Sequence, residues 1–418
     1  MKLDTKALRH LASEDWRVLT AVEMGSKNHE VVPTPLIEKI SRLRGGASGV
    51  HRSISALAKV GLIARVKEAR YDGYRLTYGG LDYLALHTYS ARREVYSVGE
   101  RIGVGKESDI TVVADHEGTQ KVLKIHRLGR ISFRSVKSNR DYLKNRASGG
   151  SWMYLSRLAA QKEFAFMKAL RGEGFPVPEP ISQSRHTVLM SLIDAFPLRQ
   201  IASVPDPASL YADLIALLLR LASHGLIHGD YNEFNILIKE EKVSAATNEE
   251  DGKTPAEGAA EGDEAEETIK LVPVVIDFPQ MVSMDHRNAE MYFDRDVACI
   301  KRFFERRFHF VSTTPGPFFK DAKKLVGRDG VTRLDATAEA SGFSKKMAKD
   351  LEAAIRQQEE ARGEQGQDDD EYDEDEDEDE DEGDEEDEEE QADIVIGGED
   401  TLAEGVSNLK VGEESRIS

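Results

Sequence analysis

The stretch His228-Gly229-Asp230-Tyr231-Asn232-Glu233-Phe234-Asn235 carries the strongest signal in this chain of 418 residues. It has a histidine, an aspartate two residues later and an asparagine five residues after that. This is the spacing H-x-D-x-x-x-x-N of the catalytic loop in phosphoryl-transfer enzymes. In such a loop a carboxylate orients the attacking hydroxyl or water, and an amide oxygen binds a magnesium ion. Asp230 and Asn235 are the candidates for these tasks, and a plain polar turn is the alternative if the stretch is taken alone.

A second signal follows along the chain, in Val274-Val275-Ile276-Asp277-Phe278-Pro279. An aspartate that ends a strand of β-branched residues needs a partner, because burying an unpaired charge is costly. Magnesium is the obvious partner, since it prefers carboxylate oxygens and keeps substrate phosphates in its coordination shell. The position matches the D-F-G motif of protein kinases, with Pro279 in place of glycine. The alternative is that Asp277 only caps a turn.

Two further signals precede the catalytic loop. Lys124 stands among apolar residues in Val122-Leu123-Lys124-Ile125, where a lysine is not expected to be buried without an anion. It would hold the α- and β-phosphates, with Glu163 of the following helix orienting it. An edge-strand lysine and an ordinary surface acid are the alternatives.

The weakest signal is the turn from Gly103 to Ser108, where the candidate phosphate-binding residues are Gly103, Gly105, Lys106 and Ser108. By itself this turn could be a plain hairpin. The order of the five signals, rather than any one of them, indicates a two-lobed kinase-like domain. In that order Met190, Ser191 and Ile193 fall where the chain crosses between lobes and binds adenine through backbone groups.

The fold class is predicted as α+β, with a winged helix at 1–92. Three helices are expected between residues 8 and 61, followed by a hairpin around Asp72-Gly73. The kinase-like domain is predicted at 93–312, with a flexible basic loop at 127–150 and a disordered acidic insertion at 241–268. A partly helical extension at 313–363 and an acidic disordered tail at 364–418 follow.

Charge and cysteine content narrow the class of protein. The formal charge of −21 equals that of the run 368–390, so the rest of the chain is about neutral, and residues 1–240 are net basic. The basic part could face a polyanion. Cys299 is the one cysteine, which excludes an intramolecular disulfide and suits a reducing compartment. The sequence shows no signal peptide and no apolar stretch long enough to span a bilayer, so no membrane contact is expected.

These motifs resemble those of the RIO kinases, over about residues 1–310. The resemblance rests on the Gly103–Asp109 stretch, on Leu123–Arg130, on His228–Asn235 and on Ile276-Asp277-Phe278-Pro279. Ordinary kinases have arginine at the position of Gly229 and glycine at that of Pro279. The winged helix resembles the type-two branch of the family. The family fold is a trimmed kinase without activation loop or peptide-binding helices.

The resemblance implies the roles of the site residues. Lys124 and Ser108 would contact phosphates, Asp230 would be catalytic, and Asn235 and Asp277 would bind Mg²⁺ beside ATP. An attack by Asp277 on the γ-phosphate, giving an aspartyl-phosphate, is a possibility at the level of the family.

The resemblance also implies a Mg²⁺-dependent ATPase or atypical serine/threonine kinase in late cytoplasmic maturation of the small (40S) ribosomal subunit and final processing of the 18S rRNA precursor. The expected partner is the pre-40S particle, with RNA contacts through the winged helix and the basic loop 121–157. The chain is expected to be a cytoplasmic monomer that can pass through the nucleus. An ATP-gated RNA-binding scaffold without turnover is the alternative, and a protein-docking role is the alternative for the winged helix.

Overall fold

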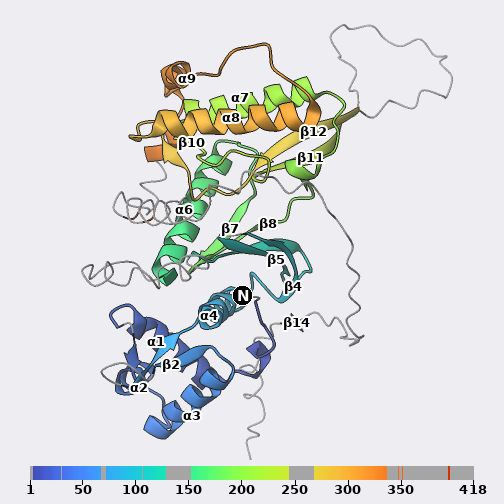
Figure 1. The fold of residues 1–418 in the computed structure, drawn as a ribbon. Helices are drawn as coiled ribbons and strands as arrows, with labels where there is room; N and C mark the ends of the chain where they lie inside the picture. Colours follow the sequence, from blue (N-terminus) through green and yellow to red (C-terminus); the bar gives the residue numbers. More distant parts are fainter. Residues whose placement is uncertain are drawn as a thin grey trace, which may run out of the picture. The chain divides into compact units, whose positions relative to one another are not determined.

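The computed structural model describes residues 3–29, 31–66, 72–105, 107–128, 152–243, 268–336, 347, 351 and 394–395 (Figure 1). The chain forms two compact units, residues 1–100 with 113–119 and 388–418, and residues 101–112 with 120–387. Lys106 lies outside the described residues. So do nearly all of the predicted loop at 127–150, most of the predicted insertion and most of the predicted tail.

The first unit opens with three helices that share one core. They are α1 (Ser13–Ser26), α2 (Thr34–Ser41) and α3 (Gly46–Lys59), preceded by the short η1 (Leu8–His10). Pro35 stands in the first turn of α2, where its missing N–H costs no hydrogen bond. The apolar residues of the three helices that are at most 1% exposed form the core: Val18, Leu19, Ala21, Val22, Ile37, Val50, Ile54 and Leu57. A short turn between α2 and α3 gives the predicted helix-turn-helix.

A small antiparallel sheet completes the winged helix. Its strands are β1 (Val32–Pro33), β2 (Ile63–Val66) and β3 (Gly73–Leu76), in the order β1-β3-β2. The β2–β3 pair is the predicted hairpin, with Ile63 opposite Leu76. The sequence did not indicate β1, because two residues are too short to show an alternating pattern.

The expectation that the hairpin ends this domain is wrong, because α4 (Tyr78–Ala91) follows it directly. Thr77 caps the helix by accepting a hydrogen bond from the N–H of Gly80 at 3.1 Å. α4 is buried on most of its surface, so its sequence lacks the polar stripe by which an amphipathic helix is found. The pair Gly79-Gly80 also looks like a turn rather than the start of a helix.

The second unit contains most of a six-stranded sheet, which the chain enters within β4 (Ser97–Val104). The other strands are β5 (Ser108–Ala114), β6 (Gln120–His126), β7 (Pro180–Ser184) and β8 (Thr187–Ser191), and neighbours follow the order β14-β4-β5-β6-β8-β7. β14 (Ile394–Val395) pairs with β4. α6 (Trp152–Gly172) packs against β6, β7 and β8.

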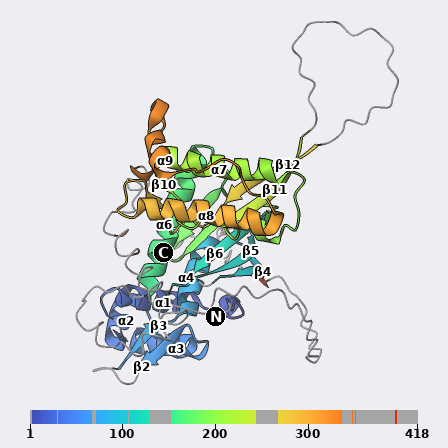
Figure 2. The ribbon, with the colours of Figure 1, turned by 45° about the horizontal axis from the view of Figure 1, so that its top comes forward.

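A second group of elements in this unit is mainly helical. α7 (Pro207–Ser223) and α8 (Ala289–Phe308) run side by side, and α9 (Phe319–Leu325) contacts both (Figures 1 and 2). The short pieces η3 (Leu198–Gln200) and η4 (Arg328–Gly330) and the strand pair β10 (Leu226–Ile227) and β13 (Val282–Ser283) belong to the same region. Asp206 caps α7 through the N–H groups of Ala208 and Ser209. This arrangement puts the catalytic loop directly after β10.

The last sheet brings the two acidic motifs together. β11 (Ile236–Val243) pairs with β12 (Thr268–Val275) along its whole length, and with β9 (Phe196–Pro197) on its other side. Residues 241–243 and 268 therefore belong to strands, which corrects both boundaries of the insertion predicted at 241–268. Ile236 stands opposite Val275, so the residue after the catalytic loop pairs with the strand that ends before Asp277.

Among the residues that the structure describes, no helix is both long enough and apolar enough to cross a bilayer.

Gly80 offers a test of how α4 is packed in the winged helix. A methyl group at Gly80 would lie 2.2 Å from the carbonyl oxygen of Leu62, whereas one at Gly79 would make an ordinary contact at 3.7 Å. We expect Gly80→Ala to destabilise the winged helix by about 1–3 kcal/mol, as overpacking does. Gly79→Ala, the matched control, should be neutral or slightly stabilising.

The measurement is urea unfolding of the full chain in a Trp152→Phe background. Trp16, whose ring stacks on His87 of α4 at 4.2 Å, is then the one tryptophan reporting on the domain. Equal midpoints for the two alanine variants would contradict this packing of α4.

Candidate active site

The catalytic loop at 228–235 is fixed to two helices. Asp296 of α8 accepts hydrogen bonds from the backbone N–H groups of Gly229 at 2.8 Å and of Tyr231 at 3.0 Å. The neighbouring Arg295 donates to the carbonyl of Gly229. The fully buried Tyr231 donates its hydroxyl to the carbonyl of Leu214 in α7 at 3.1 Å. The two residues that flank Asp230, Gly229 and Tyr231, are therefore both held in place by hydrogen bonds.

Asp296 is a site residue that the motif search missed. It is 1% exposed, and burial raises the pKa of its carboxyl to about 6 although the two backbone N–H groups oppose the rise. A signal was present, because Asp296 stands between Phe293 and Ile300 on the apolar face of the predicted helix. A charged residue at such a position needs polar partners.

Gly229 explains one departure from ordinary kinases. Its φ is +80°, and a Cβ here would lie 2.7 Å from the carbonyl oxygen of Gln280. Both the left-handed backbone and the close approach exclude a larger residue. The arginine of ordinary kinases cannot occupy this position with the loop in this conformation.

Asp230 and Asn235 lie in hydrogen-bonding contact. The amide nitrogen of Asn235 donates to the carbonyl and to the carboxylate of Asp230, both at 2.9 Å. Asn232 donates to the other carboxylate oxygen at 2.8 Å. The Asn235 nitrogen is thus directed to Asp230, and the amide oxygen accepts no hydrogen bond within the described part of the chain. That oxygen is therefore the atom left to bind a cation.

His228 connects the loop to the strand before Asp277. Its Nε2 lies 3.2 Å from the carbonyl oxygen of Ile276, and the N–H of Ile276 donates to the carbonyl of Asn235 at 3.0 Å. Burial lowers the pKa of His228 to about 4, so the ring is neutral at neutral pH. A carbonyl can only accept, so Nε2 carries the proton. The histidine is thus a fixed brace between two motifs that are far apart in the sequence.

Asp277 has a backbone conformation that is rare for an aspartate, with φ at +70°. Leaving the right-handed regions costs a residue with a Cβ about 1–2 kcal/mol. Such strain is concentrated at functional sites, where the surrounding structure enforces it. The neighbouring Phe278 is buried against His228, with ring centroids 5.8 Å apart, and the side chain of Asp277 is 38% exposed.

Lys124 links the two parts of the site. Its Nζ lies 2.7 Å from Glu163 of α6 and 2.9 Å from Asp277. Burial by itself would lower the pKa of Lys124, but the charges of Asp277 and Glu163 more than offset this and raise it. Burial would likewise raise the pKa of Glu163, but the attraction of Lys124, aided by His126, lowers it to about 2. The Lys124 amine and the Glu163 carboxylate are therefore both charged at neutral pH.

A second buried ion pair holds the turn between β4 and β5. Arg127 and Asp109, each 1% exposed, meet at 3.0 Å, and the N–H of Arg127 donates to the carbonyl of Glu107 at 2.6 Å. Within the turn, the N–H of Gly105 donates to the carbonyl of Ser108 at 2.7 Å. Gly103 lies in β4 and Ser108 begins β5, so the predicted phosphate-binding turn is present, with Lys106 outside the described residues.

The three residues predicted to bind adenine do not lie in one element, because Met190 and Ser191 belong to β8 and Ile193 follows it. Met190 is buried in β8 opposite Val122, and the N–H of Ser191 donates to the carbonyl of Glu179 at 3.0 Å. That N–H is therefore engaged and is not available to adenine in this arrangement. Ile193 lies in the segment between β8 and β9, outside both strands.

The oxygen donors fit a magnesium ion that is shared with substrate phosphates. No group of three or more His, Cys, Asp or Glu side chains suited to a metal occurs among the described residues. Asp277 and the amide oxygen of Asn235 supply only two hard ligands, which is what a phosphate-bridging magnesium requires of the protein. Both residues can be ligands of Mg²⁺, and together they leave most of its coordination positions to phosphates and water.

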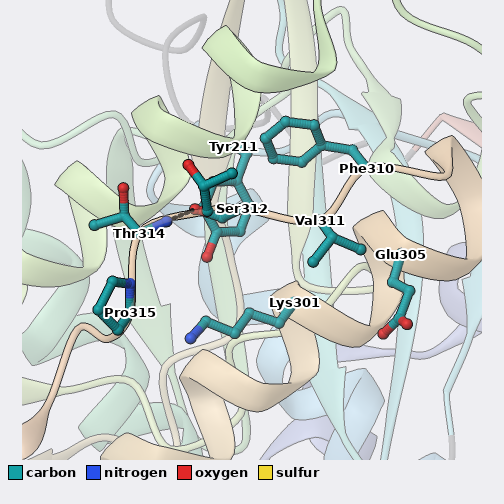
Figure 3. Close-up of a pocket in the computed structure, with 9 residues that line it drawn as sticks. Tyr211, Lys301, Glu305, Phe310, Val311, Ser312, Thr314 and Pro315 are labelled. Carbon is teal, nitrogen blue, oxygen red and sulfur yellow. Dashed lines mark hydrogen bonds between the residues drawn. The ribbon is translucent and has the colours of Figure 1, made fainter.

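Cavity shape does not identify this site. A cavity of about 300 Å³ lies at the carboxyl end of α8, lined by Tyr211, Lys301, Glu305 and the segment Phe310–Pro315 (Figure 3). It contains none of the residues predicted for the site. The charge network around Lys124, rather than the cavity, therefore marks the candidate active site.

Comparisons with known proteins agree with this architecture. The family model "Rio2, N-terminal" matches residues 8–92, and the model "RIO domain" matches residues 109–245 and 269–315. The serine/threonine-protein kinase rio2 of Schizosaccharomyces pombe is 52% identical over 352 residues, covering 84% of this chain and 92% of the relative. RIO2 of Saccharomyces cerevisiae is 47% identical, covering 85% of this chain and 81% of the relative.

The chain belongs to the Rio2 family.

A solved Rio2 structure is similar over most of the chain. The Rio2 kinase–ADP/Mg²⁺–phosphoaspartate complex from Chaetomium thermophilum is 76% identical, with a TM-score of 0.75, and the match covers 86% of this chain and all of that one. The predicted fold, a winged helix followed by a trimmed kinase domain, is confirmed. Like its Rio2 relatives, the chain is an atypical serine/threonine protein kinase.

The roles of the individual site residues stay predictions, although their positions are now clear. The structure brings together Lys124, Glu163, Asp230, Asn235 and Asp277 through direct contacts or through shared backbone hydrogen bonds. Four more residues support the site. Asp109, His126 and Arg127 lie within the motif stretches but had no role assigned from the sequence, and Asp296 lies outside them.

The strained backbone at Asp277 predicts an unusual order of stabilities. Asp277→Ala and Asp277→Gly both remove the carboxylate, but only glycine adopts a positive φ without cost. We expect the glycine variant to be more stable than the alanine variant by about 1 kcal/mol in urea unfolding of the full chain.

The control is the exposed Asp213 inside α7, where φ is helical and the order should be reversed by about 1 kcal/mol. An Asp277→Ala variant as stable as the glycine variant would show that the backbone at this position is unstrained.

Proposed function

We propose that the chain cleaves the γ-phosphate from ATP at the site formed by Lys124, Asp230, Asn235 and Asp277, with Mg²⁺ as its cofactor. One observation carries the proposal, namely the buried amine of Lys124 held 2.7 Å from Glu163 and 2.9 Å from Asp277. A buried cation that contacts a half-exposed carboxylate is suited to receive a phosphate chain beside that carboxylate. Rio2 from Chaetomium thermophilum binds ADP and Mg²⁺.

Each side chain has a task that follows from its contacts. Lys124 neutralises the α- and β-phosphates, and Glu163 fixes the direction of its amine. Asn235 and Asp277 hold the magnesium ion, which neutralises charge that develops on the phosphate oxygens. Asp230, fixed by Asn232 and Asn235, orients the attacking water or hydroxyl and accepts its proton.

We place a first phosphoryl transfer on Asp277 itself. Its carboxylate oxygen attacks the γ-phosphorus, the bond from that phosphorus to the β–γ bridging oxygen breaks, and ADP leaves with the electron pair. Water then attacks the phosphorus of the acyl phosphate, Asp230 takes the proton, and inorganic phosphate leaves with the carboxylate restored. The related Chaetomium thermophilum kinase was crystallised with a phosphoaspartate, which supports this assignment.

Turnover of ATP tests the proposal. With γ-labelled ATP and Mg²⁺ we expect phosphate release by the wild type and a loss of at least about 100-fold in Asp230→Ala and in Asp277→Ala. Asp213→Ala removes an exposed carboxylate from α7 and should retain full turnover.

Absence of turnover in the wild type, with ATP still bound tightly, would favour the scaffold without catalysis. Full turnover in either site variant would exclude that residue from the catalytic role proposed here.

We further propose that the kinase acts on the pre-40S particle in the cytoplasm, in the last processing of the 18S rRNA precursor, with passage through the nucleus. Support comes from the family to which the chain belongs and from the basic character of residues 1–240. The second helix of the helix-turn-helix, α3, exposes His51, Arg52 and Lys59. Their exposure and basic character support the proposed contact with RNA phosphates.

Salt-dependent binding to pre-40S particles tests this contact. If Arg52 and Lys59 each neutralise one phosphate, Arg52→Ala with Lys59→Ala should weaken binding and make the dependence of affinity on salt concentration less steep by about two ions. Lys239→Ala, an exposed lysine of β11, is the control. Unchanged affinity and salt dependence in the double variant would favour a winged helix that docks on protein instead.

A further inference from the structure

The end of strand β6 carries a histidine whose only described polar partner is the active-site glutamate. Nε2 of His126 lies 2.7 Å from Oε2 of Glu163, and the two side chains are 3% and 1% exposed. The other oxygen of Glu163, Oε1, contacts Lys124 at 2.7 Å. By hydrogen-bond geometry, neither Nε2 of His126 nor Oε2 of Glu163 has a partner among the described residues, and their 2.7 Å ion-pair contact is the polar approach that each makes there. Glu163 therefore stands between two basic groups from the same strand.

This arrangement matters because a buried carboxylate oxygen without a partner is costly. Leaving a buried charged group without a hydrogen bond is costly, and the group can escape that cost by rotating or by binding a proton. Rotation of Glu163 would move Oε1 away from Lys124. Protonation would remove the charge that keeps the Lys124 amine in place.

The strand holds the histidine ring where it can prevent both outcomes. The backbone N–H of His126 donates to the carbonyl of His186 at 2.9 Å, which continues the pairing of β6 with β8. Lys124 and His126 are two residues apart in this strand, so both side chains project from the same face toward α6. The side chain of Arg127, one residue further, instead meets Asp109.

We propose that His126 is a positioning residue for phosphoryl transfer, which holds the second oxygen of Glu163 so that the first oxygen directs the Lys124 amine toward Asp277 and the phosphates. The inference rests on the task proposed above for Lys124. It adds a member to the lysine–glutamate pair of protein kinases, in which one ion pair orients the lysine. His126 acts through Glu163 and does not contact the phosphates.

A double-mutant cycle between His126 and Glu163 tests the proposal. The variants are His126→Leu, Glu163→Gln and the pair, each in the full chain, with ATP turnover measured at saturating MgATP. We expect His126→Leu to lower kcat on the order of 10-fold or more in the native background and to have little further effect in the Glu163→Gln background. His126→Gln, which retains an N–H donor, should restore most of the lost kcat.

His224→Leu is the matched control for removing a buried histidine. His224 is 7% exposed and contacts the carbonyl of Thr332, at the end of α7 and outside the site. This variant should lose stability without a change in kcat.

Several outcomes would overturn the proposal. They are an unchanged kcat in His126→Leu, an equal fall of kcat in both backgrounds, or a folded His126→Gln that is as impaired as His126→Leu. If His126→Leu does not fold, the comparison of His126→Gln with and without Glu163→Gln decides by the same criterion. If the wild type itself does not turn over, the function proposed above fails, and the cycle is then carried out on unfolding free energies, where zero coupling between the two residues overturns the contact.

Discussion

The site depends on one buried cation, the amine of Lys124, held between Glu163 and Asp277. A lysine that is 7% exposed keeps its charge only because two carboxylates offset the cost of removing it from water. Glu163 belongs to α6 and Asp277 follows β12, so the amine joins the sheet-bearing part of the kinase domain to its helical part. Under the proposed function, the phosphates of ATP would compete with Asp277 for this amine.

The catalytic loop depends on a second buried group, the carboxylate of Asp296, which accepts hydrogen bonds from two backbone N–H groups of the loop. Lys124 contacts the side chains of Glu163 and Asp277, whereas Asp296 holds the backbone of the catalytic loop. The connection between them is the backbone itself, since the N–H of Ile276 donates to the carbonyl of Asn235 and His228 reaches the carbonyl of Ile276. A displacement of the catalytic loop would therefore move Asp277 as well.

The sequence pointed to residues whose types and spacing suggest phosphoryl-transfer chemistry, and it did not point to the residues that hold them in place. Lys124, Asp230, Asn235 and Asp277 belong to motifs whose spacing is dictated by chemistry, so local sequence reveals them. The partners Asp109 and Asp296 carry ordinary residue types, and their importance arises from burial that only tertiary packing creates. The same limit applies to α4, because a helix buried on most sides has no periodic pattern to read. Boundaries beside the acidic insertion were misplaced for another reason: strands continue into charged residues when a partner strand supplies the hydrogen bonds, as β12 does for β11.

Three basic residues at the end of β6 show why this strand tolerates so much buried charge. Lys124, His126 and Arg127 are all buried, and each contacts a carboxylate. Lys124 and His126 share Glu163 of α6, whereas Arg127 contacts Asp109 of β5. Arg127 holds the turn between β4 and β5 through Asp109, and Lys124 with His126 contacts α6 through Glu163. Hydrophobic residues could pack at this strand end without the cost of burying charge, but they would not hold the carboxylates of Asp109 and Glu163 in position. Strand β6 and the residue that follows it therefore fix both the turn between β4 and β5 and the Lys124 amine, and a shift of β6 along its neighbours would displace the two together.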